Sequence, residues 1–394
     1  MLQNVKGVTD LPLPTPEAQR HSEQLIAQIR AEMEAHGGRL DFARYMALAL
    51  YSPGLGYYAA GARKFGAAGD FVTAPEISPQ FSRCLARQCQ QVLAQLPGGA
   101  ILEFGAGTGA MAGDILLELE RCHALPSHYF ILDVSAELRQ RQQQTLLQRV
   151  PRLLDRVQWL DRLPIGGFRG VVLANEVLDA MPVHRFQITA EGYNEIYVAW
   201  QGERFAWSHE RPGAALEAWY RAATPAGLAP GYESEVNLAI APWLAGLVDS
   251  LAAGAVLLID YGFPRHEYYH PQRSGGTLMC HYRHRAHPDP LILPGLQDIT
   301  AHVDFTAVAE AALDAGFEVL GFTNQAYFLL ALGLAESVAE VNPLDTRAQL
   351  ELAQQIKKLT LPSEMGELFK VMALGKGLDM TLRGFTLNDQ RGRL

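Results

Sequence analysis

Short apolar runs recur along the chain after residue 98, and each is followed by a stretch with helical spacing. Continuous apolar runs of this length are typical of strands covered on both faces, and strands that alternate with helices are typical of a parallel sheet. The pattern therefore predicts an α/β fold with a doubly wound, mostly parallel sheet. The predicted strands cover residues 100–104, 129–133, 157–160, 171–175 and 255–260, with 318–322 and 368–374 as candidates for a sixth and a seventh.

Two stretches of the chain depart from this alternation of strands and helices, and a separate helical pattern lies before the first predicted strand. Thr15 and Pro16 begin a helical pattern near the start of the sequence. Residues 183–210 alternate like antiparallel strands, and residues 331–363 have helical spacing. We therefore expect three consecutive segments. They are a helical and loop cover (1–98), a Rossmann-like core with a β insertion at about 183–210 (99–330), and a helical insertion with the last core strand (331–394).

Composition and charge narrow the class of protein. With 48% hydrophobic and 19% charged residues, the chain is predicted to fold into a globular protein. The formal net charge of −9 disfavours non-specific binding to nucleic acid. The most apolar stretch, 236–259, contains Pro242, Asp249 and Gly254, so no membrane span is expected. The four cysteines form no CxxC pair, and the first twenty residues lack the pattern of an export or transit signal, so we expect a cytoplasmic protein.

A glycine-rich loop follows the first predicted strand directly. Glycines permit a tight turn and let a cofactor lie against bare backbone near the amides of a helix N-terminus. The register that ends at Ala110 also fits the GxGxxA pattern of dinucleotide oxidoreductases, and a purely structural turn would use the same residue types. The loop alone leaves these alternatives open. Its residues are Gly105, Ala106, Gly107, Thr108 and Gly109.

Three acids near the ends of the first three strands bear on this choice. Glu103 lies inside an apolar strand, where a carboxylate is explained by a ligand ammonium group, and S-adenosylmethionine carries one whereas NAD does not. Asp133 ends the second strand, where a carboxylate can accept both ribose hydroxyls of a nucleotide cofactor. Asp161 follows the third strand and is a candidate for the adenine amino group, with a solvated loop acid as the alternative.

An acidic turn follows the fourth strand. Asn175, Glu176 and Asp179 lie at the carboxyl edge of the predicted sheet, where open α/β sheets bind their ligands. A helical turn would place Glu176 and Asp179 on one face, able to clamp a guanidinium together. The alternative is that Asp179 caps the next helix and only Glu176 faces the site.

A possible metal motif is present as well. His266, Glu267 and His270 match the HExxH pattern of zinc proteases, which requires a helix that aligns the two histidines. Pro264 and Pro271 flank the motif closely, so a helix of sufficient length is not expected. We therefore predict no metal site, and place these residues in a long loop.

With these residues laid out, the chain resembles the MidA-like family of S-adenosylmethionine-dependent methyltransferases, which includes the mitochondrial complex I assembly-factor methyltransferase. The resemblance covers nearly the whole chain. It rests on five motifs in order: GDFVTAPEISP (69–79), EFGAGTG (103–109), NEVLDAMP (175–182), DYG (260–262) and DITAHVDF (298–305).

The resemblance implies a class I, Rossmann-like methyltransferase that uses S-adenosyl-L-methionine as its cofactor. It also implies transfer to an arginine of a protein substrate, such as a respiratory complex I type subunit. By location, Glu176 and Asp179 match the two acids that hold the guanidinium in arginine methyltransferases, although the spacing is shorter. His302 is a candidate for the same pocket, or packs against the sheet edge. Asp70 and Thr73 are candidates for a loop over the cofactor, or for a self-contained turn.

Two other functions compete with this hypothesis. An NAD-dependent oxidoreductase would use the same glycine loop, and Glu103 argues against it. A chaperone that binds the methyl donor without turnover would hold a partner through its insertions, and the presence of Glu103, Asp133 and Glu176 argues against a dead enzyme.

Overall fold

The computed structural model describes residues 11–60, 73–223, 227–340, 342 and 344–394. The chain divides into two compact units, and each is built from three separate segments. The first unit comprises Met1–Phe71, Asp179–Ile240 and Arg265–Val303, and the second comprises Val72–Leu178, Ala241–Pro264 and Asp304–Leu394. These bounds differ from the three consecutive segments expected from the sequence, because the insertions after the fourth and fifth strands belong to the same unit as the N-terminal helices.

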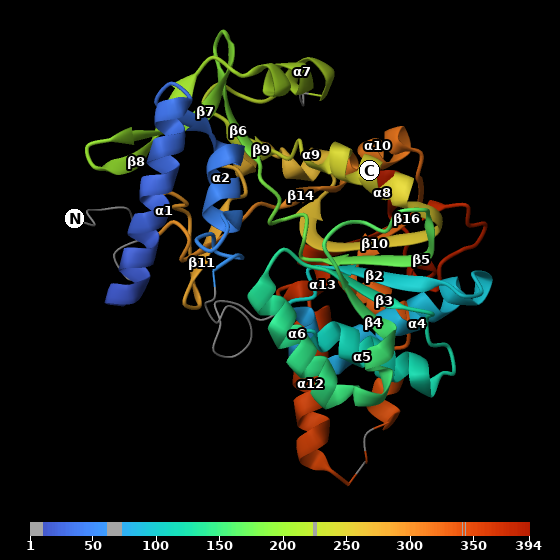
Figure 1. The fold of residues 1–394 in the computed structure, drawn as a ribbon. Helices are drawn as coiled ribbons and strands as arrows, with labels where there is room; N and C mark the ends of the chain where they lie inside the picture. Colours follow the sequence, from blue (N-terminus) through green and yellow to red (C-terminus); the bar gives the residue numbers. More distant parts are fainter. Residues whose placement is uncertain (1–10, 61–72, 224–226, 341, 343) are drawn as a thin grey trace. The chain divides into compact units, whose positions relative to one another are not determined.

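The second unit contains the long sheet, whose strands follow the order β15-β16-β10-β5-β2-β3-β4. Figure 1 labels the strands from β16 to β4. The pairs from β4 to β10 are parallel, whereas β16 runs antiparallel to both β10 and β15. The predicted doubly wound, mostly parallel sheet is therefore confirmed. The strands are β2 (Ala100–Phe104), β3 (Tyr129–Leu132), β4 (Val157–Leu160), β5 (Phe168–Asn175), β10 (Leu251–Phe263), β15 (Glu318–Asn324) and β16 (Phe369–Lys376).

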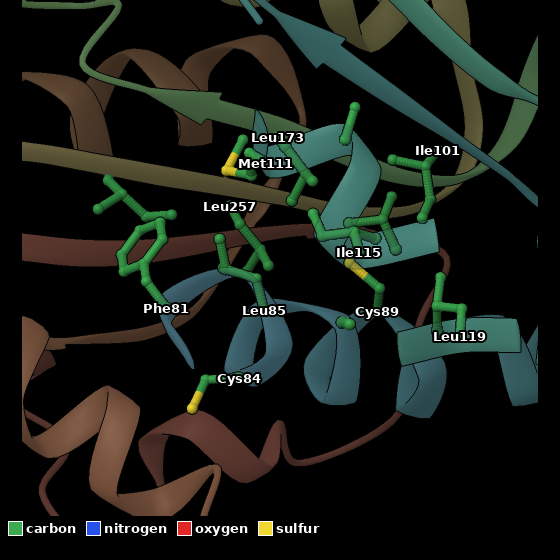
Figure 2. Packing of buried hydrophobic residues seen from close by; sticks show 14 of the residues in the cluster. Phe81, Cys84, Leu85, Cys89, Ile101, Met111, Ile115, Leu119, Leu173 and Leu257 are labelled. Atoms are coloured by element: carbon green, nitrogen blue, oxygen red, sulfur yellow. The ribbon is translucent and has the colours of Figure 1, made fainter. Parts of the chain in front are cut away.

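Helices α4 (Pro79–Gln95) and α5 (Ala110–Arg121) pack against this sheet and form its apolar core (Figure 2). The side chains of Phe81, Leu85 and Ile115 meet those of Leu173 and Leu257 from the central strands, and all five are almost completely buried. Two cysteines, Cys84 and Cys89, lie in the same core, and burial raises the pKa of each thiol to about 12.

Most of the other helices lie between strands of the long sheet or in the insertions. The helices are α6 (Ala136–Arg149), α7 (Ala214–Ala223), α8 (Ile240–Ser250), α10 (Phe305–Ala315), α11 (Gln325–Ala331) and α12 (Thr346–Thr360), with the short α3 (Ala74–Ile77), α9 (Arg265–Tyr268) and α13 (Met365–Leu368). The two-residue strand β14 is Val303–Asp304. The helical pattern expected after residue 331 is thus present, mainly as α12.

Two glycines allow the central strands to approach one another. Gly170 and Gly254 have φ angles of +147° and +153°, and a Cβ atom at either position would lie within 2 Å of a backbone oxygen on the adjacent strand. Only glycine lacks that atom, so no other residue type fits without moving the strands apart.

The first unit combines two N-terminal helices with antiparallel strands. Helices α1 (Pro16–Ala35) and α2 (Phe42–Tyr51) share a core with the strands, in which Leu25, Phe42 and Val198 are fully buried. Its larger sheet has the order β1-β7-β6-β9, with β8 paired to β7, and its smaller one β12-β11-β13. The strands are β1 (Arg39–Asp41), β6 (His184–Thr189), β7 (Gly192–Gln201), β8 (Arg204–Glu210), β9 (Glu233–Val236), β11 (Met279–Tyr282), β12 (Arg285–His287) and β13 (Asp298–Thr300).

The antiparallel strands expected at about 183–210 are β6, β7 and β8, and β7 and β8 form a hairpin. Gly202 and Glu203 connect the two strands with φ angles of +53° and +66°. Two consecutive positive φ angles are typical of a two-residue hairpin turn whose twist matches the strands. Within the described part of the chain, no helix is long and apolar enough to cross a bilayer.

Candidate functional site

The glycine loop joins β2 to α5 in a left-handed backbone conformation. Gly105, Gly107 and Gly109 have φ angles of +60°, +53° and +82°, and Gly109 is the N-cap of α5. A Cβ atom at Gly107 would have no heavy atom of the described residues within 4 Å, so the backbone there borders open space. The loop therefore presents bare backbone at a helix N-terminus, as a nucleotide-type ligand requires.

Glu103 lies one residue before the end of β2 and is almost completely buried. Burial raises the pKa of its carboxyl to about 8, and the nearby Asp133 adds to this, whereas the hydrogen bond that Tyr129 donates opposes it. The Tyr129 hydroxyl lies 2.7 Å from Glu103 Oε2. A buried acid with a pKa this high is typical of a functional site, because an arriving cation can ionise it.

Asp133 follows β3 and is held by two donors. The Ser135 backbone N–H donates to Asp133 Oδ1 at 2.9 Å, and Gln142 Nε2 donates to Asp133 Oδ2 at 2.8 Å. Ser135 also caps α6 by accepting from the Leu138 N–H. The carboxylate is thereby fixed close to the glycine loop, since Gln142 Nε2 also donates to the Gly107 carbonyl.

Asp161 lies beyond the end of β4 and is exposed, with 89% of its side chain accessible. Its carboxylate pairs with Arg139 of α6 at 2.8 Å, and Arg139 also donates to the backbone carbonyls of Asp133 and Leu160. This geometry suits the solvated loop acid that the sequence left as an alternative. A role for Asp161 toward an adenine amino group stays a prediction.

The acidic turn after β5 is not helical. Residues 176–179 form bends and a turn, and β6 follows at His184, so the predicted helical turn that places Glu176 and Asp179 on one face is wrong. The alternative that Asp179 caps a following helix is wrong for the same reason. Glu176 adopts a left-handed conformation with φ +53°, and its N–H donates to the Ile259 carbonyl.

Asp260, on the neighbouring strand β10, binds the backbone of this turn. Its Oδ2 accepts hydrogen bonds from the backbone N–H groups of Val177 (3.2 Å) and Leu178 (2.9 Å). The carboxylate thereby holds the turn through two backbone donors, and the left-handed φ of Glu176 takes the chain out of a helical path. Asn175 Nδ2 donates to Glu176 Oε1 at 3.1 Å, which fixes the glutamate side chain at the carboxyl edge of the sheet.

The first unit contains both Asp179 and His302. The Asp179 carbonyl accepts from the Ala301 N–H at 3.0 Å, and the His302 N–H donates to Thr277 Oγ1 at 3.1 Å, so the two predicted residues lie on adjoining backbone. Burial, followed by the nearby carboxylate of Asp298, raises the pKa of Tyr58 well above its ordinary value, with Asp179 contributing further. The protonated Tyr58 hydroxyl donates to Asp298 Oδ1 at 2.8 Å.

The predicted loop over the cofactor is described only in part. Asp70 lies outside the described residues. Thr73 is the N-cap of α3, and its carbonyl accepts from the N–H groups of Glu76 and Ile77. This arrangement matches the self-contained turn that the sequence left open, and a cofactor contact by Thr73 stays a prediction.

The HExxH segment does not form a continuous helix. Helix α9 ends at Tyr268, so His270 lies beyond it and instead caps a short turn by accepting from the Gln272 N–H. Among the described residues, no group of three or more histidine, cysteine, aspartate or glutamate side chains is placed to hold a metal ion.

Two residues at the carboxyl edge of the long sheet, Asp260 and Gln142, are not predicted as site residues from the sequence pattern. Asp260 entered only as part of a family motif, although an acid at the end of the fifth strand is itself a signal. Gln142 is not among the predicted site residues. It occupies the same helical stripe as Leu138 and Leu146, and all three are buried, so their spacing of four residues could have indicated an inward-facing amide.

Comparison with known proteins agrees with this geometry. The model of an S-adenosyl-L-methionine-dependent methyltransferase family matches residues 84–323, which is more than half of the chain. A crystal structure from Burkholderia thailandensis, of a likely methyl transferase bound to S-adenosyl-homocysteine, is 46% identical with a TM-score of 0.94, and covers 98% of this chain and 100% of that one.

Curated relatives extend the similarity along the chain. Protein arginine methyltransferase NDUFAF7, mitochondrial, from Danio rerio is 29% identical and the match covers 86% of this chain and 83% of the relative. The Homo sapiens protein of the same name is 28% identical, covering 86% and 80%. Because these relatives are named as mitochondrial proteins, the expectation of a cytoplasmic location is wrong.

The same findings decide between the hypotheses for the glycine loop. A ligand of the S-adenosyl type is bound by the similar crystal structure, so an NAD-dependent oxidoreductase is not favoured. S-adenosyl-L-methionine is the cofactor of the matched family. The chain therefore belongs to the S-adenosyl-L-methionine-dependent methyltransferases.

Proposed function

We propose that this methyltransferase transfers the methyl group to an arginine side chain of a protein substrate, with a respiratory complex I type subunit as the expected class of acceptor. Relatives matched over 86% of the chain are named protein arginine methyltransferases. The observation that carries the proposal is the position of Glu176. The turn that bears it lies against the glycine loop, since a Cβ atom at Gly105 would be 3.6 Å from Val177 Cγ2.

The residues around the glycine loop fit the cofactor. The open space beside Gly107 leaves room for a ligand against the backbone, and the buried Glu103 offers a carboxylate to an ammonium group. We assign the loop backbone, with Ala106 and the three glycines, to the cofactor chain, Glu103 to its ammonium group and Asp133 to its ribose hydroxyls. We also assign Asn175 to the cofactor site, because its buried Oδ1 has no hydrogen-bond partner among the described residues.

The acceptor side of the reaction is assigned to Glu176. When bound, the cofactor supplies an electrophilic methyl group on its sulfonium. The Glu176 carboxylate would accept hydrogen bonds from a guanidinium and orient one nitrogen, and its negative charge would favour the attack electrostatically. Asp179 and His302 stay predicted contributors to acceptor binding, both in the first unit.

Mass spectrometry of a labelled lysate tests this function. We expect that a lysate lacking the protein, given purified enzyme and donor with an isotopically labelled methyl group, shows label on an arginine of one polypeptide. The control omits the enzyme. Label confined to small molecules would contradict a protein substrate while leaving the methyltransferase assignment in place, and label on lysine or a chain terminus would contradict arginine.

The raised pKa of Glu103 predicts a pH dependence of stability. In the ligand-free protein Glu103 keeps its proton up to about pH 8, whereas the unfolded chain loses it near 4.5. The folded state therefore binds more protons between these values, so its stability falls as the pH rises through this window. In wild type, Glu103 should lower the free energy of unfolding by up to ~1.4 kcal/mol for each pH unit in this window. We expect this contribution to be absent in Glu103→Gln.

Urea unfolding at pH 5, 6, 7 and 8 measures this effect, with the exposed Glu318→Gln of the same unit as the matched control. The slopes of unfolding free energy against pH should differ between wild type and Glu103→Gln, and agree between wild type and the control. Parallel slopes for all three proteins would show that Glu103 is ionised in the folded protein at neutral pH.

A further inference from the structure

Gln142 of α6 connects three parts of the cofactor edge through one buried amide. Its Nε2 donates to Asp133 Oδ2 at 2.8 Å and to the Gly107 carbonyl at 3.2 Å, and its Oε1 accepts from Trp159 Nε1 at 3.0 Å. The side chain is fully buried, and all of these residues belong to the second unit. One amide thus links β3, the glycine loop and β4.

The chemistry of the three partners leaves only one orientation for this amide. The indole N–H of Trp159 can only donate, so it requires the amide oxygen. The Gly107 carbonyl and an ionised Asp133 can only accept, so they require the amide nitrogen. Trp159 therefore fixes which way Gln142 faces, and Gln142 in turn fixes the carboxylate and the loop.

The backbone of α6 contributes to the same contact. A Cβ atom at Gly109 would lie 3.1 Å from Gln142 Cα, so the third glycine packs directly against this residue. Asp133 keeps its second oxygen on the Ser135 N–H. The position of the carboxylate relative to the loop therefore depends on the amide of Gln142 and on a backbone donor next to Asp133.

We infer that Gln142 is a positioning residue for the methyl donor, holding Asp133 and the Gly107 carbonyl in the geometry that binds it, with Trp159 as its anchor. The inference rests on the cofactor assignments proposed above. Gln142 does not touch the reacting atoms. Its loss should therefore weaken donor binding and raise KM for the donor, while kcat at saturating donor changes little.

Two substitutions separate its roles. Gln142→Leu removes both donors and the acceptor. Gln142→Glu keeps the shape and the acceptor for Trp159 but replaces the donor with a carboxylate beside Asp133. We expect each to weaken binding of S-adenosyl-homocysteine, measured by calorimetry, by about tenfold or more, because a charge-assisted hydrogen bond is lost. Gln143→Leu and Gln143→Glu, at an exposed position of the same helix, are the matched controls and should bind as wild type.

A third variant covers the case in which these proteins fail to fold. Trp159→Phe keeps an aromatic ring but removes the N–H that orients Gln142, together with part of the indole ring, and we expect about threefold weaker binding. Unchanged Kd in the folded variants, with a lower unfolding temperature, would show a structural role alone and overturn the inference. So would a fall in kcat without a change in KM.

The outcome also separates this inference from the cofactor assignments. If S-adenosyl-homocysteine binds the wild type and Gly107→Val abolishes that binding, while the Gln142 and Trp159 variants bind normally, only the positioning role fails. If Gly107→Val and Glu103→Gln bind as wild type, the assignments on which the inference rests fail, and the inference fails with them.

Discussion

Replacing Gly107 by valine is expected to abolish binding of S-adenosyl-L-methionine. The backbone at this position has a φ angle of +53°, and a side chain there would enter open space beside the glycine loop. We assign that space to the cofactor, so the valine methyl groups would occupy it. Calorimetric titration of the purified variant should show a loss in affinity of at least about 100-fold, equivalent to ~2.7 kcal/mol.

Gly98→Val is the control for backbone strain. Gly98 also has a positive φ angle, +72°, and open space around its missing side chain as far as the described residues go, but it precedes β2 rather than following it. We expect this variant to bind the donor as wild type does, at some cost in stability. Unchanged affinity in Gly107→Val would remove the glycine loop from the cofactor site, and equal losses in both variants would assign the effect to strain.

Replacing Glu176 by glutamine is expected to remove turnover and to spare cofactor binding. The substitution keeps the size of the side chain and removes the negative charge that we assign to the guanidinium of the acceptor. Loss of one preorganised electrostatic contact lowers kcat by about 100-fold or more in other enzymes. Transfer of a labelled methyl group to the acceptor, with donor affinity measured in parallel, tests the two expectations together.

Glu203→Gln provides the matched control, because Glu203 is also a glutamate with a positive φ angle (+66°), in the exposed turn between β7 and β8. It should leave both turnover and binding unchanged. Turnover in Glu176→Gln equal to that of wild type would exclude Glu176 from the mechanism. Weaker donor binding in Glu176→Gln would instead place the residue on the cofactor side.

Much of the sheet could be predicted because its central strands, such as β2 and β5, are buried on both faces. A run such as 171–175 has no polar residue before Asn175, so it is recognisable without knowledge of its neighbours. The direction of β16 could not be predicted in this way. An apolar run fits a parallel or an antiparallel position equally well, and β16 takes the antiparallel one between β10 and β15.

The shape of the acidic turn could not be predicted for a different reason. Spacing of three residues suggested one helical face for Glu176 and Asp179, but local spacing does not reveal long-range hydrogen bonds. The carboxylate of Asp260, more than 80 positions later in the chain, binds the N–H groups of Val177 and Leu178. A contact of this kind depends on the pairing of β5 with β10.

Gln142 shows a third limit of sequence reasoning. It lies in the stretch Arg139-Gln-Arg-Gln-Gln-Gln144, which is typical of a solvated helix surface. Only its place between Leu138 and Leu146 on the buried stripe distinguishes it from its neighbours. The identity of its partners, Asp133 and Trp159, follows from the order of the parallel strands and not from the helix itself.

The place of β16 in the sheet has a consequence for synthesis of the protein. Among the strands of this sheet, β16 leaves the ribosome last, yet it joins β10 to β15. Until residue 376 has emerged, those two strands lack the partner between them, and unpaired strand edges invite association with other chains. Pairing over more than 100 residues, from β10 to β16, is also slow. The nascent chain therefore completes its catalytic sheet only once β16 has been translated, and its need for chaperones should be greatest just before that point.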